Sequence, residues 1–152
     1  DLVGPYDRDW QARAVALGVA DVVRFTGSLS HAAARAHQSA AELLVLWRPR
    51  GDGFSSMVPG KLYEYLDSGR PVLAVLPAGD EAAALVKRAG GAVIAPGDHQ
   101  ALASEIASRL ARWRAGERVP SNRPVWLAAL TRAHLAGELA HALDTLVAGA
   151  GA

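Results

Sequence analysis

The chain has 152 residues, the size of a single domain, and its lack of cysteine excludes disulfides, thiolate metal sites and thiol catalysis. Hydrophobic residues make up 51% and charged residues 20%, which is the balance of a folded globular protein. The 16 basic and 15 acidic side chains leave a formal net charge of +1, without the basic excess of a nucleic-acid-binding protein.

Apolar runs of strand length alternate with segments of helical period along the chain. In chain order the pattern predicts strand Leu2–Pro5, helix Asp7–Leu17, strand Val22–Phe25, helix His31–Ser39, strand Leu43–Leu46, helix Pro59–Ser68, strand Val72–Leu76, helix Asp80–Ala89, strand Ala92–Ile94, helix His99–Trp113 and one long amphipathic helix Val125–Val147. Asp7, Ser30 and Asp80 are predicted N-caps, and Gly18 a helix stop.

Short apolar strands separated by helices are typical of a parallel sheet covered on both faces. The fold class is therefore predicted to be α/β, a Rossmann-like doubly wound parallel sheet with a long C-terminal helix. We assign residues 1–119 to the sheet domain and residues 120–152 to a linker and the amphipathic helix of the same domain.

The loop after Leu46 is about twice the usual ~2–6 residues of a βα loop, and in parallel sheets such loops bind ligands. It carries arginines, glycines and hydroxyls, namely Arg48, Arg50, Gly51, Asp52, Gly53, Ser55 and Ser56. This composition favours an anionic ligand, and a tolerated surface insertion is the alternative.

The helix after this loop begins with an unfavourably placed cation. Pro59 suits the first helical position, so Lys61 lies in the first turn, where it opposes the helix dipole at ~0.3–1 kcal/mol. A bound phosphate would reverse that sign. The alternative is that Lys61 reaches into solvent or pairs with Glu64.

Several segments together resemble the donor-site region of retaining, group 1 glycosyltransferases of the GT-B fold. The resemblance is carried by Val23–Ser30, Ala41–Leu46, Gly53-Phe54, Val58–Leu66, Ser68–Ala74 and Gly91–Asp98, in the family's order and spacing to about Leu110. It implies that the chain is the C-terminal, nucleotide-sugar-binding half of such an enzyme, acting on an unknown acceptor when joined to its N-terminal half.

The resemblance also implies roles for particular residues. Glu64 would bind the ribose hydroxyls, because a carboxylate accepts both protons of a vicinal diol. The amides of Gly60, Lys61 and Leu62 would face the diphosphate, and the turn formed by Gly27, Ser28 and Leu29 would present backbone groups to the base. No metal and no cofactor beside the nucleotide-diphosphate sugar is implied.

Two departures from the family pattern limit the prediction. Ser56 stands where the family commonly has a first glutamate, which leaves the contact with the sugar or its leaving oxygen open, although a serine hydroxyl could still bond there. Ser55, next to it, is also expected in the substrate site. The family's opening strand, with its arginine and lysine, is also expected to be missing. Because that strand is central, the strands on either side must close up or another chain must fill the gap.

These departures lead us to expect a piece of a longer protein that lacks transferase activity by itself. A non-catalytic nucleotide-binding or assembly module, and a nucleotide-sugar epimerase of GT-B shape, remain as alternatives. The apolar stripe of the C-terminal helix, with Trp126, Leu130, Leu139, Leu143 and Leu146, suggests packing on the sheet domain or self-association. We expect a cytoplasmic location, and peripheral attachment to a membrane through the full-length enzyme is left open.

Overall fold

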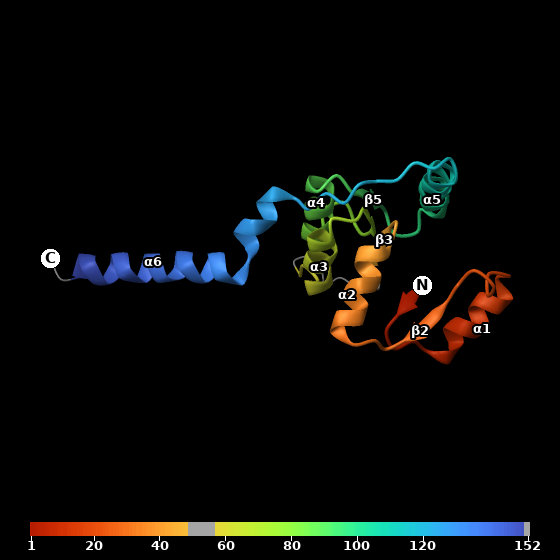
Figure 1. Cartoon of the computed structure of the whole chain (residues 1–152), viewed down its shortest axis with the longest axis horizontal. Coiled ribbons are helices and arrows are strands. Elements are labelled where there is room, and N and C mark those ends of the chain that lie inside the picture. Colours follow the sequence, from red (N-terminus) through yellow and green to blue (C-terminus); the bar gives the residue numbers. More distant parts are fainter. Residues whose placement is uncertain (49–56, 151–152) are drawn as a thin grey trace. The chain divides into compact units, whose positions relative to one another are not determined.

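The computed structural model describes residues 1–48 and 57–150 (Figure 1). Its contacts divide the chain into two compact units, Asp1–Ala41 and Glu42–Ala152, and each unit contains a sheet of parallel strands. Parallel strands that alternate with helices confirm the predicted α/β class. The strands nevertheless form two sheets where one was expected.

Each sheet pairs strands of one unit, and the expectation that the strands close up or that another chain fills the gap stays a prediction. The sheet of the first unit has strands of only two and three residues. Such short strands leave few backbone groups for a further ladder of hydrogen bonds. The boundary predicted at residue 119 stays a prediction.

The first unit consists of two strand–helix pairs, β1 (Leu2–Val3), α1 (Arg8–Ala16), β2 (Phe25–Gly27) and α2 (His31–Ala40). The N-caps predicted for both helices are confirmed. Asp7 accepts a hydrogen bond from the Asp9 amide at 3.3 Å, and Ser30 accepts one from the Ala33 amide at 3.3 Å. Gly18 follows α1 with a φ of +67°, a conformation that glycine adopts readily.

The strand predicted at Val22–Phe25 is displaced along the chain. The amides of Val22 and Val23 both donate to the Val19 carbonyl, at 3.1 and 3.0 Å, which holds these residues in a turn. The strand begins only at Phe25, where the Thr26 hydroxyl donates to the Leu2 carbonyl of the neighbouring strand at 3.1 Å. Local hydrogen bonds therefore outweigh the strand propensity of the two valines.

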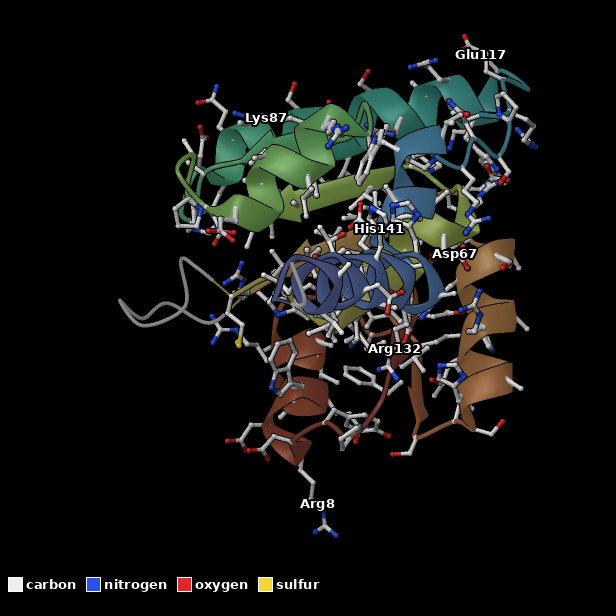
Figure 2. All side chains as sticks on the ribbon, turned by 90° about the vertical axis from the view of Figure 1, so that its left-hand side faces the viewer. Arg8, Asp67, Lys87, Glu117, Arg132 and His141 are labelled. Carbon is white, nitrogen blue, oxygen red and sulfur yellow. The ribbon has the colours of Figure 1, made fainter. Side chains whose placement is uncertain are left out.

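The second unit contains a three-stranded parallel sheet in the order β3-β4-β5. Its elements are β3 (Leu44–Trp47), α3 (Gly60–Ser68), β4 (Val72–Val75), α4 (Glu81–Arg88), β5 (Ala92–Ile94) and α5 (His99–Arg114). Helices α3 and α4 lie on one side of this sheet and α5 on the other (Figure 1). Lys87 lies on the outer surface of α4 (Figure 2).

The main core lies between this sheet and the two helices α3 and α4. Its members are apolar and less than a tenth exposed: Leu46, Leu62, Leu66, Val72, Ala74, Leu76, Ala82, Ala83, Val86 and Leu127. Each fully buried leucine or valine contributes ~1.5–3 kcal/mol. This packing sets the position of α3, which carries four of the predicted site residues, Gly60, Lys61, Leu62 and Glu64.

The predicted helix Val125–Val147 is wrong, because two elements occupy this stretch. A 3-10 helix, η1 (Val125–Leu130), precedes helix α6 (Arg132–Ala150). Thr131 separates them with extended backbone (φ −72°, ψ 147°), and its hydroxyl accepts a hydrogen bond from the His134 amide at 3.3 Å. Leu127 is buried in the core at 5% exposure, and the break lets η1 pack there.

Helix α6, on which Arg132 and His141 are labelled in Figure 2, carries large apolar side chains that are exposed. Leu139 and Leu146, from the predicted stripe, are 62% and 70% exposed. Its self-association stays a prediction. Among residues 1–48 and 57–150, no helix combines the length and the apolar character needed to cross a membrane.

Candidate functional site

The N-terminal end of α3 is the first part of the predicted site. Pro59, predicted as the first helical residue, is the N-cap, so the helix begins one residue later than predicted, and the proline side chain cannot cap it. The Leu62 amide donates to the Pro59 carbonyl at 2.9 Å, and the Leu62 side chain is fully buried. The amides of Gly60 and Lys61 are therefore the two that remain directed outward from the first turn.

Lys61 is exposed in this first turn, and no ion pair joins it to another described residue. The first turn of α3 contains no acidic residue, whereas α1 has Asp9 and α4 has Glu81 at this place. Positive charge from the helix dipole and from the lysine therefore adds up at one end of α3. The predicted alternative of a Lys61–Glu64 ion pair is not formed.

Glu64 lies one turn further along α3 and is half-buried. Its neighbour Tyr65 packs against the core. Burial of the Tyr65 hydroxyl, and secondly the charge of Glu64, raise the pKa of Tyr65 above its usual value of 10.0.

The far end of α3 is held by the segment Ser121–Arg123, which we call the strap. The Ser121 hydroxyl donates to the Ser68 carbonyl at 2.9 Å, and the Asn122 amide donates to the Gly69 carbonyl at 2.8 Å. Arg123 forms an ion pair with Asp67 at 2.8 Å, and Asp67 is labelled in Figure 2. These bonds fix the helix that presents Lys61 and Glu64.

The turn predicted to face a base lies in the first unit. Gly27 has a φ of +72°, and its carbonyl accepts a hydrogen bond from the Gly4 amide at 2.9 Å. Ser28 is exposed and Leu29 is half-buried. The predicted site is thus divided between the two units, with Gly27, Ser28 and Leu29 in one and Gly60–Glu64 in the other.

Arg48, expected among the ligands of an anion, instead pairs with a buried acid. Its Nη2 donates to Oδ1 of Asp80 at 2.6 Å, and the Asp80 side chain is only 3% exposed. The same Asp80 oxygen accepts a hydrogen bond from the Ala82 amide at 2.8 Å, which confirms the predicted N-cap of α4. The sequence pattern predicted Asp80 as the cap of α4 but did not predict its ion pair with Arg48.

The order of the strands could have predicted this ion pair. Arg48 follows β3 and Asp80 lies in the loop after β4, and these neighbouring parallel strands end at the same edge of the sheet. The positive charge of Arg48 is therefore balanced within the protein. Ser55 and Ser56, like Arg50, Asp52 and the loop glycines, lie outside the described residues.

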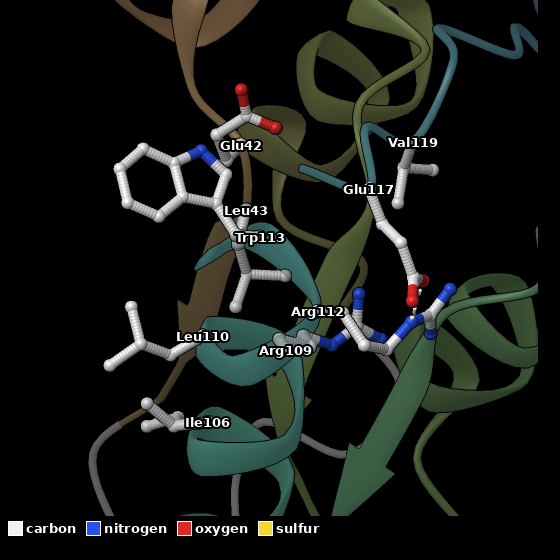
Figure 3. A pocket seen from close by; sticks show the side chains of 9 residues that line it. All are labelled: Glu42, Leu43, Ile106, Arg109, Leu110, Arg112, Trp113, Glu117 and Val119. Carbon is white, nitrogen blue, oxygen red and sulfur yellow. Dashed lines mark hydrogen bonds and ion pairs between the residues drawn. The ribbon is translucent and has the colours of Figure 1, made fainter. Parts of the chain in front are cut away.

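An apolar groove of about 350 Å³ lies beside α5 and contains none of the predicted site residues (Figure 3). Its apolar lining is made of Leu43, Ile106, Leu110, Trp113 and Val119. At its rim Arg112 forms an ion pair with Glu117 at 2.7 Å. No group of three or more metal-ligating side chains gathers within the described parts of the chain.

The comparison with known families agrees with the arrangement of these elements. Residues 1–112 match the family described as Glycosyl transferases group 1. The chain belongs to this family. No curated protein and no solved structure matches the chain.

The family match in this group 1 glycosyltransferase covers both sheets, helices α1–α4 and all of α5 but its last two residues. The strap, η1 and α6 lie beyond the matched residues. The predicted family is therefore confirmed over the part of the chain that contains every predicted site residue. The roles of those residues stay predictions.

Proposed function

We propose that this glycosyltransferase domain binds the nucleoside diphosphate of a sugar donor, with the N-terminal half of α3 as its anchor. The observation that carries the proposal is the positive charge of Lys61, which has no ion-pair partner among the described residues and lies in a first turn without a side-chain cap, one turn before Glu64. An anion bound there would turn an unfavourable cation–dipole contact into a favourable site.

Two parts of the donor, the diphosphate and the ribose, then have partners on α3. The diphosphate lies against the Gly60 and Lys61 amides and the Lys61 ammonium group, whose three donors suit phosphate oxygens. The Glu64 carboxylate accepts protons from the ribose diol. The roles that the family resemblance implies for Gly27, Ser28 and Leu29, and for Ser55 and Ser56, stay predictions.

The chemical step belongs to the full-length enzyme. We infer that it transfers the sugar to an acceptor with retention of configuration once the acceptor-binding half is joined. No metal and no further cofactor takes part, because amides and basic side chains neutralise the diphosphate. The isolated chain should therefore bind donor nucleotides without turning them over.

Calorimetric titration of the purified chain with UDP, GDP and ADP tests the binding step. A lost hydrogen bond to a charged group costs ~1.5–3 kcal/mol, or about ten- to a hundredfold in affinity. Glu64→Gln should weaken the best nucleotide by this factor with little change in melting temperature. Lys61→Ala should weaken the diphosphate more than the corresponding nucleoside.

Two matched variants on α4 serve as controls. Lys87→Ala and Glu81→Gln remove the same charges from exposed positions and should leave nucleotide binding unchanged. If Lys61→Ala and Glu64→Gln behave like these controls, the donor site on α3 is disproved. Turnover of a nucleotide sugar by the isolated chain, beyond trace hydrolysis, would disprove the need for a second half.

A further inference from the structure

Helix α6, in the second unit, has an apolar stripe that no part of the described chain covers. Its leucines recur at intervals of three or four residues, which places them on one side of the helix. Four of them are 47–70% exposed and form what we call the α6 stripe: Leu135, Leu139, Leu143 and Leu146. The opposite side carries polar residues, among them His134 and Glu138, which form an ion pair at 3.3 Å. A contiguous row of exposed leucines is typical of a surface that contacts an apolar partner.

The apolar groove beside α5 belongs to the same unit and is open to solvent (Figure 3). Four of its apolar side chains are 40–45% exposed, namely Ile106, Leu110, Trp113 and Val119. Arg118 holds the Trp113 ring, because its guanidinium lies 5.0 Å from the ring centroid and donates to the Trp113 carbonyl at 2.8 Å. The second unit therefore has an exposed apolar helix and, elsewhere, a groove with an apolar lining.

The two surfaces carry opposite charge. Between residues 106 and 119 the sequence has four arginines and one acid, Glu117. Three of these arginines form ion pairs within the unit, whereas Arg114, in the last turn of α5, forms none with any described residue. After its first residue, α6 contains Glu138 and Asp144 and no lysine or arginine. An acidic helix therefore complements the charge around the groove.

We propose that the chain forms a dimer in which the α6 stripe of each copy docks into the α5 groove of the other. An amphipathic helix in an apolar groove, with leucines at this spacing as anchors, is a recurrent mode of recognition. The reciprocal exchange gives two identical contacts related by a twofold axis. The 19 residues of α6 span about 28 Å, and each copy contributes one helix and one groove to the ~800 Å² that a standard interface buries per partner.

The connection between η1 and α6 permits this exchange. Leu127 of η1 is buried in the core, and the extended backbone at Thr131 ends η1 before α6 begins. Docking of α6 on another copy therefore leaves the core of each copy intact.

Sedimentation equilibrium of the full chain tests the proposal. Wild type should be a dimer that dissociates on dilution and more readily at high salt, because salt screens the charges around the groove. Leu139→Glu in the stripe and Leu110→Glu in the groove each place a carboxylate in both contacts. At about tenfold or more per contact, each variant should weaken the dimer at least about a hundredfold.

Two controls introduce the same charge at exposed positions of the same helices. Thr145→Glu lies on the polar side of α6, and Ala111→Glu lies on α5 outside the lining of the groove. Both should leave the dimer intact. Circular dichroism and urea midpoints show whether each variant is folded.

A mixture of the Leu139→Glu and Leu110→Glu chains separates docking in the groove from pairing of two α6 helices. One variant keeps an intact groove and the other an intact α6, so a mixed dimer regains one of the two contacts. Sedimentation with one variant labelled should detect mixed dimers at concentrations at which neither variant dimerises alone. If α6 paired with α6, the mixed dimer would have one defective helix and would gain nothing.

Hydrogen exchange gives a readout on the unmodified protein, because the α6 amides should exchange more slowly in the dimer than after dilution. Exchange of α6 that does not change on dilution would overturn the proposal even if the variants failed to fold. A wild-type chain that is still monomeric at about 1 mM would also overturn it, as would dimers that survive Leu110→Glu or a mixture no more dimeric than its components. Binding of a monomeric wild-type chain to phosphatidylglycerol vesicles, lost in Leu110→Glu, would overturn it in favour of a membrane site.

Discussion

Gly69, at the C-terminal end of α3, is the glycine at which an added methyl group should lower the free energy of unfolding most. Its φ of +69° is left-handed, and the strap lies directly over it. A Cβ atom would lie on the Ser121 hydroxyl, 2.9 Å from the Asn122 nitrogen and 3.0 Å from the Arg123 nitrogen. The Ser121 side chain can rotate away, but the two backbone nitrogens can move only if the whole strap moves.

Gly69→Ala should lower the free energy of unfolding through two separate effects, backbone strain and crowding against the strap. A non-glycine residue in the left-handed region costs ~1–2 kcal/mol. Overpacking against the strap adds ~1–3 kcal/mol, and displacing the strap loses the Asn122–Gly69 hydrogen bond, worth ~1 kcal/mol. The sum of roughly 3–6 kcal/mol is a large part of the ~5–15 kcal/mol that holds a domain folded.

Gly90→Ala is a matched control that separates the two effects. Gly90 follows α4 with a φ of +79°, and nothing lies within 4 Å of its Cβ position. This variant should therefore lose only the ~1–2 kcal/mol of backbone strain. Urea unfolding followed by circular dichroism measures both, and Gly69→Ala should unfold at a clearly lower urea concentration.

If Gly69→Ala lowers the free energy of unfolding no more than Gly90→Ala does, the strap does not crowd the Cβ position of residue 69. A double variant gives a further check, since Ser121→Ala removes the hydroxyl that the new methyl group meets. The cost of Gly69→Ala should then fall in the Ser121→Ala background, and strict additivity of the two changes would show that Ser121 does not press on this position.

Two further predictions concern the core side of the site. Asp80→Ala removes both the cap of α4 and the partner of the buried Arg48 guanidinium, so it should lower the free energy of unfolding in urea by ~3–5 kcal/mol. Asp98→Ala removes an exposed cap only and should lower it by ~0.5–2 kcal/mol. Equal losses in the two variants would show that the Arg48–Asp80 ion pair does not stabilise the fold. Burial and the Glu64 charge raise the pKa of Tyr65, so with rising pH the Tyr65 hydroxyl loses its proton in the unfolded chain before it does so in the folded chain. The stability present below pH 10.0 should therefore fall as the pH rises through the pKa that Tyr65 has in the folded chain. Tyr65→Phe should remove that fall, which urea midpoints measured on either side of about pH 10 would detect.

Much of the local structure could be predicted because it depends on neighbours in the chain. Asp7, Ser30 and Asp80 cap the helices that the sequence assigns to them, since a cap needs only a side chain and an amide two or three residues away. The placement of Lys61 and Glu64 on one helix also follows from spacing alone. The family resemblance, carried by motifs in order, was confirmed over residues 1–112.

The features that the sequence did not predict are decided by contacts between distant segments. Leu127 enters the core beside α3 and α4, and this burial divides the expected long helix at Thr131. The Arg48–Asp80 pair joins residues 32 positions apart, and it forms only because β3 and β4 are neighbours in the sheet.

The amino-acid sequence thus determined which segments are helices, where most of them begin and which side chains share a face, because these are short-range properties. Tertiary structure decided that the strands form two sheets and that the strap closes over Gly69. Such outcomes depend on how much apolar surface each segment can bury against segments far away in the chain, and a local sequence pattern does not contain this information.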